Sequence, residues 1–159
     1  MALALGIDPG TATTGFGLVR SLGDGGLEMV DYGTIQTPAG EPAHQRLAML
    51  YHRLKEILLL RRPDSVAVEK LFFQRNVSTA IAVGQARGVV MLAIAEAGLE
   101  VFEYTPNEVK QAVVGYGSAQ KRQVQEMVRT LLALPEVPRP DDAADALAIA
   151  ITHLNTRRY

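Results

Sequence analysis

Residues 4–18 of the chain have the sequence ALGIDPGTATTGFGL. A short apolar run ends in one carboxylate, Asp8; a turn follows at once, and a second apolar run returns. Asp-Pro-Gly favours a turn, because proline presets φ at one position and glycine supplies a positive φ at the next. Gly10, Gly15 and Gly17 leave the backbone beyond Asp8 nearly bare, so a bulky anion can approach it. Taken alone, the stretch equally fits a hairpin whose aspartate only caps a strand.

The remaining sequence predicts a mixed α/β architecture. Strands are expected at residues 3–7, 15–20, 27–35, 65–69 and 100–104, and helices at 43–60, 78–97, 105 onward, 119–134 and 142–155. Three strands in succession predict an antiparallel meander, and the later alternation of helix and strand predicts crossover connections. Gly98 is expected to end one helix and Asp141 to cap the last one. Thr105 is expected to cap a short helix, with Pro106 in its first turn. We therefore expect one domain over residues 1–159, a five-stranded mixed sheet with helices on both faces.

Composition places the chain among soluble proteins of the cytoplasm. Hydrophobic residues make up 48% and charged residues 21%, which is ordinary for a globular domain. There is no cysteine, so disulfides and thiolate metal sites are excluded. Neither a signal peptide nor an apolar run of bilayer length is expected from the sequence.

Four carboxylates stand at the ends of apolar elements. Asp8 and Glu69 each end a strand, and strands that lie side by side bring such ends to one edge of the sheet. Asp142 and Asp145 are three residues apart, which places both on one face of a helix that is otherwise apolar. Aspartates in a first helical turn are also common simply because they complement the helix dipole.

Acids that converge repel one another, and divalent cations relieve that repulsion. Oxygen ligands favour Mg²⁺ or Mn²⁺, whereas a zinc site is improbable in a chain with three histidines and no cysteine. Two such ions would suit an in-line displacement at phosphorus. The net charge of −1 argues against nucleic acid at first sight. If four of the 17 acids hold metal, however, the 16 basic residues outnumber those that remain.

Several motifs together resemble the RuvC family of bacterial Holliday-junction resolvases. The motifs are Gly6–Gly10, Thr14–Gly17, Val68-Glu69, Gly84–Gly88, Val109–Gln111, Gly115–Lys121 and Asp142–Ala148. The resemblance extends nearly end to end. It implies a ribonuclease H-like fold and a homodimer with two Mg²⁺ ions per active site, for which Mn²⁺ would substitute. It also implies symmetric nicking of four-way DNA junctions, with a 5′-phosphate and a 3′-hydroxyl as products.

The same resemblance assigns roles to individual residues. Asp8, Glu69, Asp142 and Asp145 become the metal ligands, and Lys110 and Lys121 become basic residues near the site. A lysine so placed would stabilise charge at the scissile phosphate, and we expect Lys121 to have this catalytic role. The resemblance further suggests the RuvA–RuvB branch-migration complex as a partner, and involvement of the small-residue helix 80–97 in the dimer.

Further residues around the acids are candidates for DNA contact. Phe72 and Phe73 follow Glu69 closely, and an exposed ring there would stack on an unpaired base. The resemblance favours Phe72, but Phe73 remains open, and paired phenylalanines beside a strand are usually core. Arg75 and Asn76 would contact phosphates or base edges. Lys110, Lys121 and Arg122 would contact phosphates. Most basic residues, however, are simply exposed to solvent and contact no ligand.

Three other functions fit parts of this pattern. Asp-x-Gly-Thr also opens actin-like kinases and chaperone ATPases, but those need a second such domain. A non-catalytic junction-binding module would keep the fold, yet all four acids are present here. A ribonuclease H-like nuclease with another nucleic-acid substrate also stays open, because fold and metals do not fix the substrate. The sequence therefore predicts a metal-dependent endonuclease that resolves Holliday junctions in recombination and repair.

Overall fold

The computed structural model describes residues 1–70 and 76–157. Its elements are β1 (Leu3–Asp8), β2 (Thr13–Ser21), β3 (Leu27–Gln36), α1 (Ala43–Arg61), β4 (Ser65–Glu69), α2 (Val77–Glu96), β5 (Val101–Tyr104), α3 (Pro106–Val113), α4 (Lys121–Leu131) and α5 (Asp141–Thr156). The five strands form one sheet in the order β3-β2-β1-β4-β5. β1, β2 and β3 pair antiparallel, while β4 pairs parallel with both β1 and β5. The predicted meander, crossovers and mixed sheet are confirmed.

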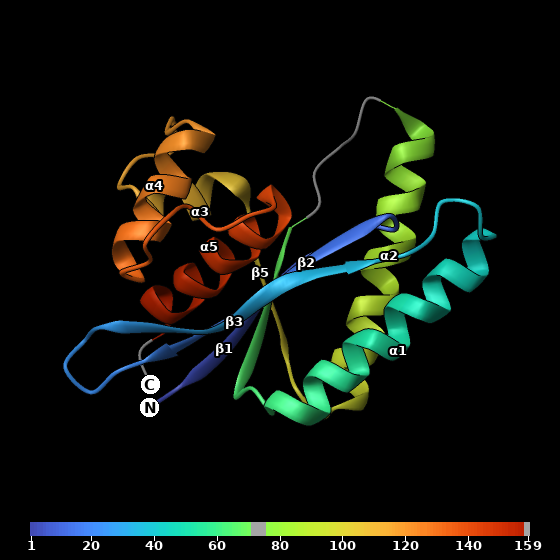
Figure 1. The fold of residues 1–159 in the computed structure, drawn as a ribbon, viewed down its shortest axis with the longest axis horizontal. Helices are drawn as coiled ribbons and strands as arrows, with labels where there is room; N and C mark the ends of the chain where they lie inside the picture. Colours follow the sequence, from blue (N-terminus) through green and yellow to red (C-terminus); the bar gives the residue numbers. More distant parts are fainter. Residues whose placement is uncertain (71–75, 158–159) are drawn as a thin grey trace.

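Helices cover both faces of the sheet, as predicted: α1 and α2 lie on one face, and α3, α4 and α5 on the other (Figure 1). Side chains of a strand alternate between its two faces. Leu3, Leu5 and Ile7 of β1 accordingly enter the core under α1 and α2, whereas Ala4 enters the core under α5. Two separate apolar layers therefore sandwich the sheet.

α5 lies directly on the backbone of β1 and β2. A Cβ atom added at Gly6 would stand 2.0 Å from the carbonyl oxygen of Ala146, and one at Gly15 would stand 2.0 Å from that of Asp142. A Cβ at Gly17 would meet Leu147 at 2.8 Å. These glycines are required because the helix approaches closer than any side chain would allow. They fix both the height and the axial position of α5 over the sheet.

The turn after Asp8 differs from the prediction in one detail. Gly10 does not have a positive φ; the glycines that do are Gly25, Gly98 and Gly115. Glycine is needed at position 10 for space, because an added Cβ would stand 2.3 Å from the carbonyl oxygen of Thr13. The Thr14 hydroxyl closes the turn, donating to the Gly10 carbonyl at 2.6 Å and accepting from the Gly10 N–H at 3.1 Å.

Helix ends follow the predicted signals with two corrections. Thr105 and Glu108 form a capping box at the start of α3, with Pro106 as its first residue, and Gly98 has the left-handed conformation beyond the end of α2. α4 is shorter than the predicted 119–134. The expected cap of α5 by Asp141 is wrong: Pro140 occupies the cap position, and the Asp141 carboxylate is paired with Lys121 instead.

α2 corrects the expectation that no segment has the length and polarity of a bilayer span. By length and composition alone this 20-residue helix would qualify, since the mean hydropathy of an 18-residue window within it is 1.6. Its apolar residues do not form an unbroken run, because Gln85 and Arg87 interrupt them. Ala86, Val90 and Ile94 are buried against the sheet, but only 22% of the window is buried in all, so most of the helix surface is open.

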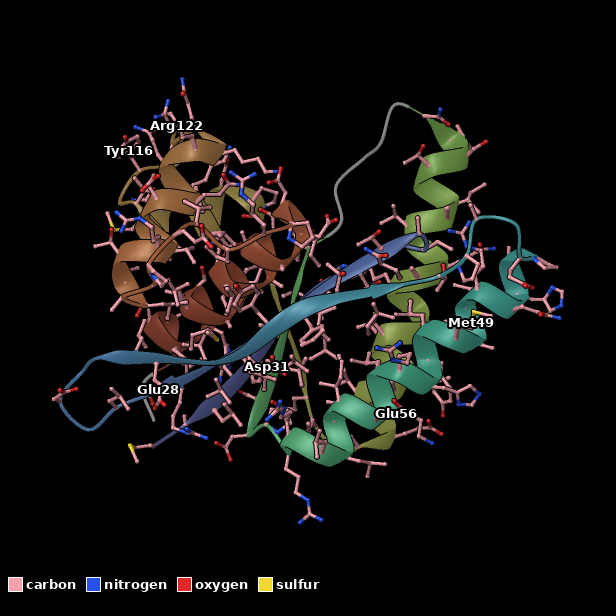
Figure 2. All side chains as sticks on the ribbon, viewed as in Figure 1. Glu28, Asp31, Met49, Glu56, Tyr116 and Arg122 are labelled. Carbon is pink, nitrogen blue, oxygen red and sulfur yellow. The ribbon has the colours of Figure 1, made fainter. Side chains whose placement is uncertain are left out.

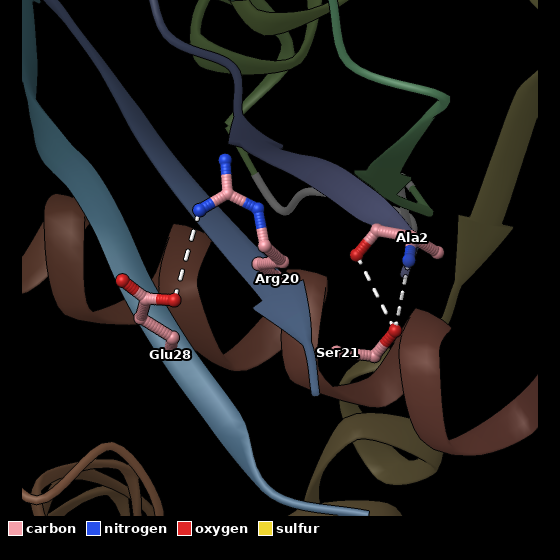
Figure 3. A network of polar contacts seen from close by, with 4 residues as sticks. All are labelled: Ala2, Arg20, Ser21 and Glu28. Carbon is pink, nitrogen blue, oxygen red and sulfur yellow. Dashed lines mark hydrogen bonds and ion pairs between the residues drawn. The ribbon is translucent and has the colours of Figure 1, made fainter. Parts of the chain in front are cut away.

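The N-terminal end of the sheet is fastened by polar contacts (Figure 3). The Ser21 hydroxyl accepts from the Ala2 N–H at 3.0 Å and donates to the Ala2 carbonyl at 3.4 Å. The Ser21 N–H also donates to that carbonyl, at 2.8 Å. Arg20 and Glu28, opposite each other on β2 and β3, form an exposed ion pair at 3.6 Å. The Ser21 contacts hold the end of β1 opposite to Asp8, and the ion pair joins β2 to β3.

The close approach of α5 predicts a large cost for one added methyl group. Gly6→Ala should destabilise the protein by about 3 kcal/mol or more, because the new Cβ meets helix backbone that cannot rotate away. Urea unfolding followed by circular dichroism measures the loss. Gly23→Ala is the matched control, since an added Cβ there meets nothing within 4 Å. Equal stability of the two variants would contradict the packing described for α5.

Candidate active site

Asp8 and Glu69 lie at neighbouring strand ends on the same face of the sheet. β1 and β4 are parallel with Ile7 opposite Val68, so the next residues, Asp8 and Glu69, stand at the same edge. Ile7 and Val68 enter the core under α1 and α2. By the alternation of side chains along a strand, Asp8 and Glu69 then face α5. The expected convergence of these two acids follows from sheet register alone.

The first turn of α5 brings two more carboxylates to this edge. Gly15 pairs with Asp8 across β1 and β2, and the Asp142 backbone lies directly on Gly15. One carboxylate oxygen each from Asp8, Asp142 and Asp145 lies within 4.8 Å of the others. Glu69 is outside this group of three, but its carboxylate lies close enough to Asp8 to raise the pKa of that acid. The structure thus gathers all four predicted acids, three of them in a tight cluster.

Burial and mutual repulsion change the proton affinity of two of these acids. Burial, followed by the nearby charges of Glu69, Asp145 and Asp142, raises the pKa of Asp8 to about 8. Burial also raises the pKa of Asp145 to about 6, against the opposing effect of Lys121. Without a cation, the folded chain relieves the repulsion by keeping a proton on Asp8 near neutral pH. The cluster therefore offers several carboxylate oxygens as ligands, and a bound cation would neutralise their negative charge.

This donor set fits a hard divalent cation. All its ligand atoms are carboxylate oxygens, which suit Mg²⁺ or Mn²⁺. A softer ion would favour imidazole ligands, but His153, on the same helix as Asp142 and Asp145, is fully buried and hydrogen-bonded to the Tyr104 hydroxyl at 2.8 Å. The residues present consequently match the metal class that the sequence predicts.

A cleft of about 250 Å³ adjoins the acids. It is lined by Glu69, Pro106, Val109, Lys110, Lys121, Val124, Asp145, Ala148 and Ile149. The Lys121 ammonium group lies 3.2 Å from Asp141 and 3.8 Å from Asp145. Although partial burial acts in the opposite direction, these acids raise the pKa of Lys121, which therefore stays protonated. The cleft is thus lined by two carboxylates, Glu69 and Asp145, and by two lysines, of which Lys121 is paired with Asp145.

The other predicted DNA-contacting residues lie apart from the cleft or outside the described residues. Arg122 is exposed at the outer end of α4, near Tyr116 (Figure 2). Asn76 caps α2, since its side-chain oxygen accepts from the N–H groups of Ser78 and Thr79. Phe72, Phe73 and Arg75 lie outside the described residues.

Sequence reasoning missed two residues that contact the site. Asp141 was expected only as a cap, but it pairs with Lys121 across α4 and α5. Arg87 of α2 donates to the backbone carbonyl of Glu69 and pairs with Glu103 of β5. Neither contact has a local sequence signal, because each joins residues at least 16 positions apart.

A mixed sheet of this order, with acids at two parallel strand ends and on the helix above them, defines a ribonuclease H-like protein with a carboxylate site. The family model described as crossover junction endodeoxyribonuclease RuvC matches residues 4–153. A RuvC of Chloroflexus aggregans is 62% identical over 154 residues, covering 96% of this chain and 93% of the relative. One of Desulfitobacterium hafniense is 58% identical, covering 97% and 93%. The chain belongs to the RuvC family.

Solved structures agree with this assignment. The structure of Thermus thermophilus RuvC in complex with a Holliday junction substrate has a TM-score of 0.93 at 42% identity, covering 98% of this chain and 94% of that chain. The yeast mitochondrial Holliday junction resolvase Ydc2 has a TM-score of 0.68 at 17% identity, covering 96% and 77%, which shows the fold alone. The family and the ribonuclease H-like fold predicted from the sequence are confirmed.

The crowded acids predict an unusual pH dependence of stability. Folding raises the pKa of Asp8 from 3.8 to about 8, so the metal-free folded state binds the proton more tightly than the unfolded state. The free energy of unfolding should therefore fall as pH rises between these values and level off above pH 8. Asp8→Asn removes the charge, and its gain in stability should grow over the same range, to at least about 1 kcal/mol.

Calorimetry in EDTA at pH 5 and pH 8.5 tests this expectation, a gain of about 3 °C in Tm being expected at the higher pH. Asp24→Asn, in the exposed turn between β2 and β3, controls for the loss of one negative charge; its side-chain oxygen that accepts from Gly26 is retained. A Tm of Asp8→Asn below that of the wild type at pH 8.5 would contradict the repulsion argument.

Proposed function

We propose that this protein is an endodeoxyribonuclease that resolves four-way DNA junctions by paired, symmetric nicks during homologous recombination and repair. The observation that carries the proposal is the cluster of Asp8, Asp142 and Asp145, with Glu69 beside it, at the edge of a RuvC-family sheet. Membership of the family and the likeness to a RuvC solved with a Holliday junction substrate support the choice of substrate.

The same four acids would hold two Mg²⁺ ions, or Mn²⁺ in their place. Bound divalent cations supply Lewis-acid activation of water and neutralise charge on the phosphate. Asp8 is the most central of the acids, since the other three all raise its pKa. Binding of cations would thus require Asp8 to lose the proton that it holds in the metal-free protein.

The chain's own residues supply orientation and positive charge. Lys121, held protonated between Asp141 and Asp145, presents its ammonium group at the mouth of the acid cluster. There it would bind an oxygen of the scissile phosphate and stabilise the charge that develops on it. Lys110, on the same cleft, would hold a neighbouring phosphate. Hydrolysis is proposed to leave a 5′-phosphate and a 3′-hydroxyl.

Other contacts would position the junction. Phe72 or Phe73 is proposed to stack on an unpaired base, and Arg75 and Arg122 to bind phosphates. Asn76 would contact DNA through its amide N–H₂ group, because its oxygen already caps α2. DNA contacts would then reach from the cleft to the N-terminal end of α2.

Paired nicks need two active sites, and α2 offers a surface for a homodimer. One face of this helix carries apolar or small residues at the helical spacing expected of an interface: Val77, Ile81, Gly84, Gly88, Leu92 and Ala95. All of them are exposed except Gly84, which is half-buried. An added Cβ at Gly84 or Gly88 would meet nothing within 4 Å, so a second helix could approach closely there. We propose that a second copy of the chain covers this face.

The setting of the reaction follows from the substrate. The chain is proposed to work as a single nuclease domain over residues 1–159 in the cytoplasm, where bacterial DNA lies. The RuvA–RuvB branch-migration complex is the proposed partner that delivers the junction.

Cleavage of a labelled synthetic four-way junction, beside a linear duplex of the same sequence, tests the substrate. We expect paired nicks in the junction alone, with Mg²⁺ and not with EDTA. Nicks in both DNAs would instead indicate a ribonuclease H-like nuclease with a broader substrate. Tight junction binding without any nick would indicate a binding module.

Removal of one ligand tests the site. Asp8→Asn should lower the rate of junction cleavage at least about 1,000-fold, because a metal ligand is lost with little change in shape. Junction binding, measured by gel shift in Ca²⁺, should stay within about threefold of the wild type. The Asp24→Asn variant should cleave normally. Cleavage by purified Asp8→Asn at the wild-type rate would refute the assignment.

A charge on the exposed face of α2 tests the dimer. Ile81→Asp should shift the protein from dimer to monomer in sedimentation velocity, because the carboxylate would be buried in an apolar interface. Leu60→Asp, at a more exposed apolar position on α1, should leave the dimer intact. If Ile81→Asp sediments as the wild type does, the interface lies elsewhere.

A further inference from the structure

We propose that Arg87 is a positioning residue for the metal ligand Glu69: it fixes the backbone at the end of β4 and thereby the place of the Glu69 carboxylate. The inference rests on the proposed metal site and adds to it a residue on the opposite face of the sheet. Arg87 reaches the site from α2, whereas the four acids face α5.

The contacts of Arg87 are specific to the strand ends. One guanidinium nitrogen, Nη1, donates to the backbone carbonyl of Glu69. The other, Nη2, lies 2.7 Å from the Glu103 carboxylate on the neighbouring strand. Only 12% of the Arg87 side chain is exposed, against at least 36% for the other arginines in described ion pairs. The planar fork therefore bridges β4 and β5 in a largely buried position.

The bridge lies where the sheet itself can no longer hold β4. β4 pairs with β1 only as far as Val68, opposite Ile7, so Glu69 is held from the β5 side alone. There Lys70 donates its N–H to the Tyr104 carbonyl at 2.7 Å. Arg87 engages the carbonyl of Glu69, which fixes the peptide plane that follows this ligand. Without that bond, the Glu69 backbone could rotate and move its carboxylate away from Asp8.

α2 is itself fixed at the same end of the sheet. The Thr11 hydroxyl, in the turn after Asp8, donates to the Ala82 carbonyl of α2 at 3.1 Å. Ala86 and Val90, on either side of Arg87, are fully buried. The guanidinium therefore has little freedom to follow a displaced strand, as a positioning residue requires. A lysine at this position would keep the charge but could not bridge both partners with a planar fork.

Binding of Mn²⁺, followed by the loss of the free-ion signal in electron paramagnetic resonance, tests the inference without relying on cleavage. We expect Arg87→Lys to weaken Mn²⁺ binding about tenfold, the lower end of the effect usual for residues that orient metal ligands. In a Glu69→Gln background the same substitution should change Mn²⁺ affinity less than twofold, because Arg87 acts through Glu69. Arg61→Lys, which alters the 2.8 Å ion pair between α1 and Asp31 of β3 and touches none of the acids, is the control and should bind as the wild type does.

Glu103→Gln provides a second test that leaves Arg87 in place. It loosens the anchor of the guanidinium, and should weaken Mn²⁺ binding in the same Glu69-dependent way. A tenfold loss that persists in the Glu69→Gln background would mean a general structural role and overturn the inference. So would wild-type affinity in both Arg87→Lys and Glu103→Gln. A wild-type protein that binds no Mn²⁺ would overturn the proposed function together with this inference.

Discussion

The structure depends on the backbone contact between α5 and the glycines of β1 and β2. Gly6 and Gly15 let the helix backbone approach so closely that no methyl group fits between them. Gly15 is the residue opposite Asp8, and the carbonyl above it belongs to Asp142. A packing constraint thus brings two acids together whose charges oppose that approach. The apolar burial of α5, nearly complete beyond Asp145, supplies the free energy that holds them there.

The two faces of the sheet divide the work at the site. Asp8 and Glu69 face α5, where the other two acids and both lysines of the cleft lie. The opposite face, under α1 and α2, carries the contacts that fix the backbone beyond these strands, from Thr11 and from Arg87. Side chains alternate between the two faces along β1 and β4, so the acids lie on one face and the residues that fix their backbone lie on the other. A strand end with a ligand on one face needs its backbone held from the other.

The sequence predicts this fold well because its signals are local. Apolar runs, Gly98, the Thr105–Pro106 cap and the order of strands and helices all act within a few residues. The four acids could be found for the same reason, since each ends an apolar element. What could not be predicted joins distant segments: the Asp141–Lys121 pair, the reach of Arg87 to Glu69, and the need for space rather than a positive φ at Gly10. These depend on how packed elements meet.

The raised pKa of Asp8 also bears on how the chain folds in the cell. Burial of the Asp8 carboxylate and its repulsion by the neighbouring acids are costs that the metal-free folded state carries and the unfolded chain does not. A ligand that binds only the folded state stabilises it by mass action, by about 2.7 kcal/mol at a free concentration 100 times its Kd. That is a substantial share of the 5–15 kcal/mol that keeps a typical domain folded, about a fifth to a half. Free divalent cation would then act as a folding ligand, setting the folded fraction of the chain as well as the charge of its site.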